Sequence, residues 1–422
     1  MQQNDRVKAE KAVLVGLSAD CFRPEENATD ESLDELEALL ETAGGICEAK
    51  VLQNRHTPDP HSFIGEGKAQ EVRALLESSG ATLVVFDNDL SPSQIRALEE
   101  LTDATVLDRS ALILDIFAQR AKTAEGRLQV ELAQYQYILP RLSGMGKSMS
   151  RLGGGIGTRG PGETKLETDR RHIRQRIDKL RRDLKDVRRV RAVQRRQRQK
   201  AELPLVAIVG YTNAGKSTLL NALTDAGIEA NNRLFDTLDP TTRKLRISET
   251  QEVLLSDTVG FIRKLPHHLV SAFKATLEEL EYADLLLHVV DVSREDWREQ
   301  AATVEKVISQ LGAQQIPQLL VCNKADLCEN PDLIPSGENV VAISAKRKRG
   351  LDELLTAMEK ALGKGKHRVK LCIPYADGYL LDVIHKEAAV FSTDYDADGT
   401  VVDIECDDKL YGQLKEYEVQ DG

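Results

Sequence analysis

The chain has 422 residues and a formal net charge of −11; 41% of its residues are hydrophobic and 30% are charged. This composition is typical of a water-soluble protein of about two to four domains. Because the chain has no run of about eighteen apolar residues and opens on polar residues, we expect neither a membrane span nor a secretory signal. The six cysteines are scattered without a C-x-x-C pair, which favours reduced thiols over disulfides or a zinc site.

The charge is unevenly distributed along the chain. Between Arg170 and Lys200 there are 15 Lys and Arg against 3 Asp, a net charge of +12. The stretch Ile373–Gly422 is the reverse, with 13 acidic and 3 basic residues. A strongly basic segment in an acidic protein suggests a polyanionic partner, and nucleic acid is the first candidate. The alternative is a solvated helix surface, although such a surface usually mixes both signs of charge.

Residues 1–109 alternate strand and helix patterns and predict a small α/β domain. Strand patterns occur at 12–17, 51–52, 83–87 and 105–107, and helical spacing occurs at 33–42 and 68–78. Gly65-Glu66-Gly67-Lys68 resembles part of a phosphate loop but lacks the rest of the motif. We therefore expect a tight turn before a helix there.

Residues 110–200 predict an antiparallel helical hairpin. One helical pattern runs from about Ser110 to a stop at Pro140, and a second begins near Thr164. The second repeats its apolar residues with the spacing of a two-helix seam, at Leu166, Ile173, Ile177, Leu180, Leu184 and Val187. The two apolar stripes can bury only each other, so we expect the two helices to pair.

The predicted tip of the hairpin, Ser143–Gly162, has eight glycines in twenty residues and basic side chains at Lys147, Arg151 and Arg159. Such a loop can become ordered on an RNA or protein surface, or it can be a plain flexible connector. Residues 155–160 read G-x-G-x-x-G, but no strand precedes them. We therefore do not expect a dinucleotide site there.

A phosphate loop of the form G-x-x-x-x-G-K-[ST] lies between the apolar strand Leu205–Val209 and a helix that begins at Ser217. Glycine lets the backbone wrap a phosphate chain, Lys216 reaches the β- and γ-phosphates, and Ser217 is a candidate Mg²⁺ ligand. The candidate nucleotide-binding residues here are Gly210, Tyr211, Thr212, Asn213, Ala214, Gly215, Lys216, Ser217 and Thr218.

The remainder of residues 201–364 predicts a doubly wound, mainly parallel sheet with its ligand at the C-terminal strand ends. Strand patterns occur at 244–248, 252–256, 285–290, 318–322 and 340–343. Asp257-Thr258-Val259-Gly260 is a D-x-x-G in which the carboxylate can organise Mg²⁺ through water and Gly260 can sense the γ-phosphate.

A second motif at these strand ends predicts which base is bound. Asn323-Lys324-Ala325-Asp326 is an N-K-x-D whose carboxylate can accept both N1–H and N2–H of guanine, whereas adenine's N1 offers it no proton. Ser344-Ala345-Lys346 would close the base pocket.

Residues 365–422 predict a small acidic α/β domain. Asp394–Gly399 followed by Glu405 matches the EF-hand loop pattern. A strand-like alternation follows it instead of a helix, so we expect an acidic hairpin turn.

Three further stretches make the chain similar to the HflX family of ribosome-associated GTPases, which belong to the translation-factor-related branch of P-loop GTPases. They are Arg159–Arg171, Phe235-Asp236-Thr237-Leu238-Asp239-Pro240-Thr241, and the continuation of the D-x-x-G through Phe261-Ile262-Arg263-Lys264-Leu265-Pro266. The resemblance implies Mg²⁺-dependent GTP hydrolysis coupled to binding of the large ribosomal subunit and its rRNA, and dissociation of stalled or idle ribosomes under stress. It adds Phe235, Asp236, Thr237, Leu238 and Asp239 to the GTP site.

Within this resemblance, Lys216, Thr237 and Gly260 are the catalytic candidates, and Ser217, Thr237 and Asp257 would organise Mg²⁺. Phe261 takes the place where many GTPases carry a glutamine that orients the attacking water. A phenyl ring cannot do this, so we expect slow intrinsic hydrolysis. Either another group positions the water, or Phe261 is a packed residue and backbone groups hold the water.

The sequence thus predicts a cytoplasmic, monomeric GTPase that engages ribosomes, with peripheral membrane association left open. Two alternatives remain: an RNA-remodelling NTPase with a second nucleotide site in the N-terminal domain, and a guanine-nucleotide signalling switch with a non-ribosomal partner. Salt-sensitive binding would favour contacts with a phosphate backbone.

Overall fold

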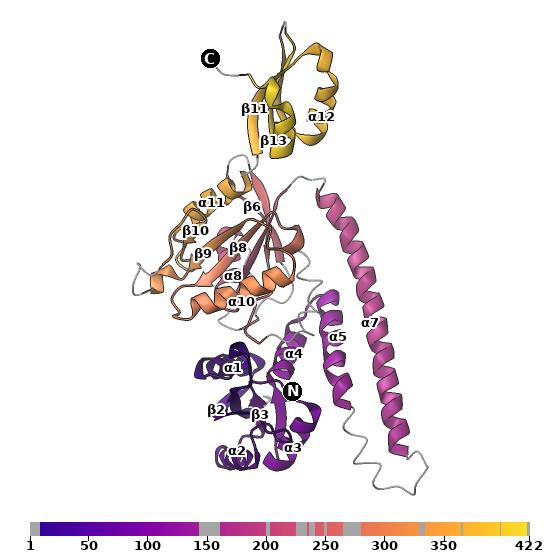
Figure 1. The fold of residues 1–422 in the computed structure, drawn as a ribbon, viewed down its shortest axis with the longest axis vertical. Helices are drawn as coiled ribbons and strands as arrows, with labels where there is room; N and C mark the ends of the chain where they lie inside the picture. Colours follow the sequence, from indigo (N-terminus) through magenta and orange to yellow (C-terminus); the bar gives the residue numbers. More distant parts are fainter. Residues whose placement is uncertain are drawn as a thin grey trace, which may run out of the picture. The chain divides into compact units, whose positions relative to one another are not determined.

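The computed structural model describes residues 9–142, 161–199, 203–224, 234–235, 241–248, 251–264, 280–328, 334–363, 366–396 and 398–419. The chain divides into two compact units, residues 1–355 and 356–422. The expected α/β architecture is confirmed. The strands form three separate sheets, of four, six and three strands (Figure 1). None of the helices in the described ranges combines the length and hydropathy needed to cross a bilayer.

The N-terminal sheet has four parallel strands in the order β2-β1-β3-β4. Its elements are β1 (Lys11–Ala19), α1 (Asp30–Ala43), β2 (Ile46–Arg55), α2 (Glu66–Ser79), β3 (Leu83–Phe86), α3 (Pro92–Thr102) and β4 (Thr105–Asp108). Helix α1 begins at a capping box in which Thr29 Oγ1 accepts the amide of Ser32, and it ends at Gly44 with φ 96°. Gly65, at φ 82°, makes the predicted turn before α2.

One predicted helix is in fact two. The helix expected from Ser110 to Pro140 breaks into α4 (Arg109–Arg120) and α5 (Ala124–Arg141). The break is explained by Thr123, whose side chain accepts the amide of Gly126 and caps α5. Pro140 lies inside the last turn of α5 and does not end it. Helix α4 packs its Leu112, Ile116 and Phe117 in the core that also contains residues of α1.

The hairpin itself consists of α5 and α7 (Pro161–Gln199), which lie side by side and antiparallel (Figure 1). The expected seam is confirmed within the described residues, because one hydrophobic cluster holds Leu128, Leu132, Tyr135, Leu139, Ile173, Ile177, Leu180 and Leu184. Arg176 of α7 also pairs with Glu131 of α5, 2.5 Å apart. The predicted tip, apart from its last residues at the start of α7, lies outside the described residues.

The central sheet has the order β10-β9-β8-β5-β7-β6, parallel except for β6. Its strands are β5 (Leu205–Gly210), β6 (Thr241–Arg246), β7 (Glu252–Asp257), β8 (Leu285–Asp291), β9 (Gln318–Asn323) and β10 (Val340–Ala342). Its helices are α8 (Lys216–Thr224), α10 (Trp297–Gln310) and α11 (Leu351–Gly363). Strand β8 is buried along its whole length, which a strand covered on both faces requires.

The C-terminal sheet is antiparallel, with the order β11-β13-β12. Its elements are β11 (Lys366–Ile373), α12 (Tyr379–Glu387), β12 (Ala389–Tyr395), β13 (Thr400–Asp407) and α13 (Asp408–Leu414). The stretch that matches the EF-hand pattern joins β12 to β13, and the Asp396 amide donates to Gly399 O at 2.9 Å. The predicted hairpin turn is therefore confirmed.

Candidate functional site

The phosphate loop leaves the end of β5 and enters α8 at Lys216. Two of its positions accept only glycine. A Cβ on Gly210 (φ 157°) would lie 2.3 Å from Val289 O, and one on Gly215 (φ 95°) would lie 2.2 Å from Asn323 Nδ2. Close approach and backbone conformation together explain the glycine spacing of the motif.

Lys216 is held inside the loop. Its Nζ donates to Tyr211 O at 2.8 Å, and the side chain is buried. Burial lowers the pKa of Lys216 to about 8, although the carboxylate of Asp257 opposes the change. Within the described residues, Asp257 is the charged group that stabilises the buried ammonium, so a bound phosphate would stabilise it further.

Ser217, in the first turn of α8, contacts Asp257 at the end of β7. Ser217 Oγ donates to Asp257 Oδ2 at 2.7 Å. The next residue, Thr258, donates its hydroxyl to Ile208 O at 2.7 Å and fixes the start of the D-x-x-G to β5. A hydroxyl and a carboxylate oxygen side by side are the donor types that Mg²⁺ prefers.

The end of the D-x-x-G packs directly on the phosphate loop. The amide of Thr212 donates to Phe261 O at 2.7 Å, and the amide of Phe261 donates to Gly210 O at 3.1 Å. A Cβ on Gly260 would lie 2.8 Å from Thr212 Cγ2 and 2.9 Å from Lys216 Nζ. Any side chain at this position would therefore push the two segments apart.

Phe261 is only 2% exposed. It belongs to a hydrophobic cluster that also contains Leu36 of α1 and Phe117 of α4. The ring is therefore packed among apolar groups, as one of the two sequence-based interpretations requires.

Asn323 braces two loops at once. Its Nδ2 donates to Ala214 O at 2.8 Å, and its Oδ1 accepts the amide of Ala345 at 3.1 Å. The side chain is 2% exposed, so its hydrogen-bonding groups serve the loops around it. This position fixes the distance between the phosphate loop and the Ser344–Lys346 loop.

Lys324 and Asp326 extend from the same strand end. Lys324 Nζ donates to Asn213 O at 3.0 Å and lies 2.7 Å from Asp291 Oδ2. A hydrogen bond from Ser344 lowers the pKa of Asp326, with Arg347 adding to the effect. Asp326 is thus an ionised acceptor at neutral pH. Arg347 Nε lies 2.8 Å from its Oδ2.

The structure brings most of the sequence-predicted residues together at one sheet edge. Thr218 and Val259 sit beside the loop on α8 and in the D-x-x-G, whereas Lys346 is exposed. Phe235 is buried. Asp236, Thr237, Leu238 and Asp239 lie outside the described residues, so the place of Thr237 stays a prediction.

Sequence reasoning misses a group of residues that link this site to the N-terminal domain. They are the buried residues Asp87 and Arg109 and the partly buried residues Glu35 and Lys264. Asp291, which pairs with Lys324 inside the candidate site, is missed as well. In the sequence, Asp87 is only the end of a strand pattern, and Lys264 is only part of a family stretch. Pairings across such long sequence distances leave no local periodicity to detect.

Three family models match the chain. They are described as GTP-binding GTPase N-terminal over residues 30–118, GTP-binding GTPase Middle Region over residues 120–198, and 50S ribosome-binding GTPase over residues 205–324. The solved structure of SsGBP in complex with GDP aligns with a TM-score of 0.47 at 24% identity, covering 84% of this chain and 99% of that one.

Two relatives named GTPase HflX match almost end to end. The protein of Caldanaerobacter subterraneus subsp. tengcongensis is 48% identical over 409 residues, which are 97% of this chain and 94% of the relative. The protein of Escherichia coli is 43% identical over 403 residues, 94% of this chain and 93% of the relative. With a complete phosphate-loop site and relatives of this similarity, the chain belongs to the HflX family of GTPases and is an enzyme that binds and hydrolyses GTP.

Proposed function

We propose that the protein is a Mg²⁺-dependent GTPase of the cytoplasm that binds the large ribosomal subunit in its GTP state and dissociates stalled or idle ribosomes. One observation supports this most: a long basic helix is joined directly to the strand that carries the phosphate loop. Helix α7 ends at Gln199, and β5 begins at Leu205. A change at the nucleotide therefore has a short path to a surface that suits RNA.

The charge on α7 is available to a partner. Exposed basic side chains follow one another along its described surface, at Arg171, Arg174, Lys179, Arg181, Arg182, Lys185 and Arg189. Cations of this density attract phosphate backbones and release counterions on binding. Residues 205–324 match a model described as 50S ribosome-binding GTPase. For this reason we propose the rRNA of the large subunit as the polyanion that α7 binds.

In the proposed reaction, water attacks the γ-phosphate of GTP, and GDP and phosphate leave. The amides of the phosphate loop and Lys216 hold the β- and γ-phosphates, and the Gly260 amide donates to the γ-phosphate. Asn323 keeps the loops around the base in place while Asp326 accepts the two guanine N–H groups.

Ser217, Thr237 and Asp257 are the proposed holders of Mg²⁺, directly or through water. When bound, the ion neutralises charge on the β- and γ-phosphates. The adjacent oxygens of Ser217 and Asp257 fit this role. Phe261 contributes no polar group, so the attacking water depends on backbone groups or on a rearrangement induced by the ribosome.

The test is co-sedimentation with whole ribosomes and isolated large subunits, in GDP and in a non-hydrolysable GTP analogue, at two salt concentrations. We expect analogue-dependent, salt-sensitive binding to the large subunit and loss of whole ribosomes from the gradient. Replacing Arg181, Arg182 and Lys185 with alanine should lower the salt slope by about one unit for each phosphate that the helix no longer binds.

The matched control removes three cations from the N-terminal domain, Lys68, Arg73 and Arg96. This variant should sediment with ribosomes as the unmodified protein does. Binding that ignores the nucleotide, or no binding at all, would contradict the proposal and leave a guanine-nucleotide switch with another partner.

A further inference from the structure

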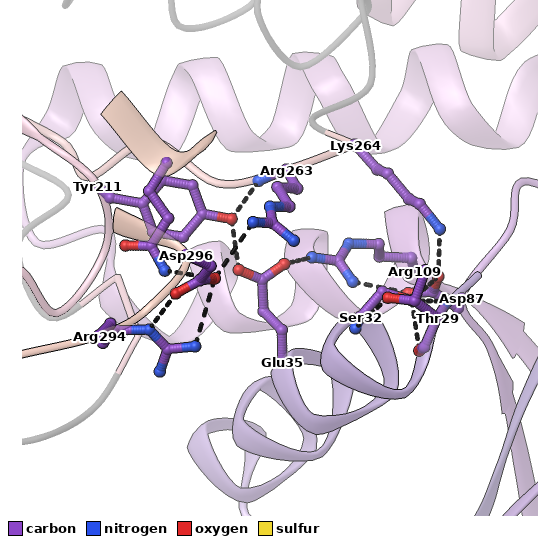
Figure 2. Close-up of polar contacts among 11 residues, drawn as sticks. Thr29, Ser32, Glu35, Asp87, Arg109, Tyr211, Arg263, Lys264, Arg294 and Asp296 are labelled. Carbon is purple, nitrogen blue, oxygen red and sulfur yellow. Dashed lines mark hydrogen bonds and ion pairs between the residues drawn. The ribbon is translucent and has the colours of Figure 1, made fainter. Parts of the chain in front are cut away.

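The segments that surround the nucleotide site rest on the N-terminal domain. Figure 2 shows the polar part of this contact, where Tyr211 and Lys264 of the GTPase domain bind Glu35 and Asp87, and the amide of Arg263 donates to the Tyr211 hydroxyl. We call the charged residues Glu35, Asp87, Arg109 and Lys264, together with Tyr211, the clasp. Asp87 and Arg109 are buried, and Glu35 and Lys264 are partly buried. Its members come from the two sides of a domain contact within one compact unit of the chain.

Tyr211 joins the phosphate loop to α1 of the N-terminal domain and to the segment that follows the D-x-x-G. Its backbone carbonyl accepts Lys216 Nζ, and its hydroxyl donates to Glu35 Oε1 of α1 and accepts the amide of Arg263 at 2.7 Å. The side chain is 4% exposed. Burial and the carboxylate of Glu35 raise the pKa of Tyr211, so the phenol stays protonated and remains a donor.

Arg109 and Lys264 balance the charges of the buried Asp87 and the partly buried Glu35. Arg109 is 1% exposed; it pairs with Glu35 and, through Nη1, with Asp87 Oδ1 at 2.7 Å. Lys264 pairs with the other oxygen of Asp87, which also accepts Ser32 Oγ at 2.8 Å. Burial opposes ionisation of Asp87, but the Arg109 and Lys264 charges outweigh it and lower its pKa.

This balance depends on Lys264 staying in place. If Lys264 leaves, the carboxylates of Asp87 and Glu35 share one guanidinium, and an uncompensated charge on the buried Asp87 is strongly destabilising. Lys264 follows Gly260 by four residues. The clasp therefore favours the one position of the D-x-x-G in which Gly260 packs against Lys216.

Residues 234–235 also contact helices α1 and α4. The Phe235 and Phe117 rings meet edge to face, with centroids 4.7 Å apart. The amide of Leu234 donates to Thr42 Oγ1 at 3.2 Å. Phe235 directly precedes residues 236–239, which the sequence assigns to the GTP site.

We propose that Glu35 and Asp87 of the N-terminal domain are positioning residues for GTP binding and hydrolysis. They act through Tyr211 and Lys264 to hold Gly260 where its amide meets the γ-phosphate. GDP lacks this phosphate, so the clasp strengthens GTP binding more than GDP binding. By thermodynamic reciprocity, GTP stabilises the docking of the N-terminal domain.

The central experiment replaces Lys264 with methionine, which keeps the length of the side chain and removes its charge. Affinities for GDP and for a non-hydrolysable GTP analogue are measured with fluorescent nucleotides, and hydrolysis is followed in single turnover at saturating GTP. We expect affinity for the analogue to fall by about 5- to 150-fold relative to affinity for GDP, the range typical of coupled sites. The hydrolysis step should also slow, and Lys264→Arg should restore both.

A matched control separates positioning from simple domain contact. Lys306 of α10 pairs with Glu25 across the same two domains at 3.1 Å, but both side chains are exposed, and neither belongs to the clasp. Lys306→Met should leave the ratio of analogue to GDP affinity unchanged. Equal losses in the Lys264 and Lys306 variants, or an unchanged ratio in Lys264→Met, would overturn the proposal.

A second pair of variants keeps the test informative if Lys264→Met does not fold. Tyr211→Phe removes the hydroxyl that contacts Glu35 and Arg263, and Glu35→Gln removes the charge that faces Tyr211 and Arg109. The double variant should cost no more than the larger single effect on analogue affinity. Additive losses would show that Glu35 does not act through Tyr211 and would overturn that part of the proposal. None of these measurements uses ribosomes, so their outcome is independent of the proposed ribosomal function.

Discussion

Lys216 carries a charge that the free protein supports poorly. Burial lowers its pKa to about 8, and bound phosphates should raise it again, because an opposite charge favours the protonated amine. Nucleotide binding above pH 8 should therefore take up close to one proton. The affinity for nucleotide should then fall by up to about tenfold for each unit that the pH rises. Below this range the amine is already charged, and uptake should vanish.

Calorimetric titration of GDP in buffers of different ionisation enthalpy measures this uptake directly. The phosphates themselves have their second pKa near about 6 and do not contribute above pH 8. Lys216→Arg, which stays charged, is the control and should show no uptake. Proton release on binding would contradict the assignment.

Thr212 holds a buried hydroxyl that finds no protein partner in the described part of the chain. The residue is 6% exposed, and its Oγ1 makes no hydrogen bond there. Its amide is bonded to Phe261, so the hydroxyl lies next to the residue that cannot orient water. A buried polar group of this kind costs stability unless a ligand or water uses it.

Thr212→Val should therefore leave the melting temperature of the nucleotide-free protein unchanged or slightly higher, while single-turnover GTP hydrolysis slows. Thr212→Ser keeps the hydroxyl and should hydrolyse at nearly the original rate. A valine variant with normal hydrolysis would show that the hydroxyl serves neither water nor phosphate.

At the scale of elements, the helical hairpin depends on a few apolar side chains between two polar surfaces. Leu180 of α7 is fully buried in the cluster that joins α7 to α5. Leu180→Ala should cost the hairpin about 2–5 kcal/mol. Hydrogen exchange of the α5 and α7 amides should accelerate, and those of β5 should not.

Lys179→Ala is the matched control, because Lys179 is next to Leu180 in the sequence and its side chain is exposed. It should leave exchange in both helices unchanged. Equal exchange in the Leu180 variant would mean that α7 is stabilised without α5, contrary to the packing described.

These elements also show what the sequence can and cannot predict. The apolar strand before Gly210 and the helix after it have strong local patterns, and so does the α5–α7 seam. The break at Thr123 escapes prediction because apolar spacing continues across it, and only the capping contact marks it. The contact of Tyr211 with Glu35 joins residues 176 positions apart, and no local pattern encodes such a pair.

For the whole molecule, one buried histidine sets a limit on acid stability. His288 on β8 is 2% exposed, and burial lowers its pKa to about 4. The unfolded chain has a histidine pKa near about 6.5, so between pH 6.5 and 4 it binds a proton that the folded protein refuses. Stability should therefore fall across this window as the pH is lowered, by up to about 3 kcal/mol.

Denaturant unfolding at several pH values tests this expectation. His288→Leu removes the titrating group and should flatten the acid side of the stability curve. His61→Leu, at an exposed position, should leave the curve as it was. An unchanged slope in the His288 variant would place the acid sensitivity elsewhere in the molecule.

Helix α7 also has a mechanical consequence. Its 39 residues form one continuous helix, and at about 1.5 Å per residue it is about 58 Å long. A rotation of about 5° at the end near β5 would carry the far end by about 5 Å, since displacement grows with distance from the pivot. A small rearrangement around a phosphate group would then displace the far end of α7 by about the length of an amino-acid side chain.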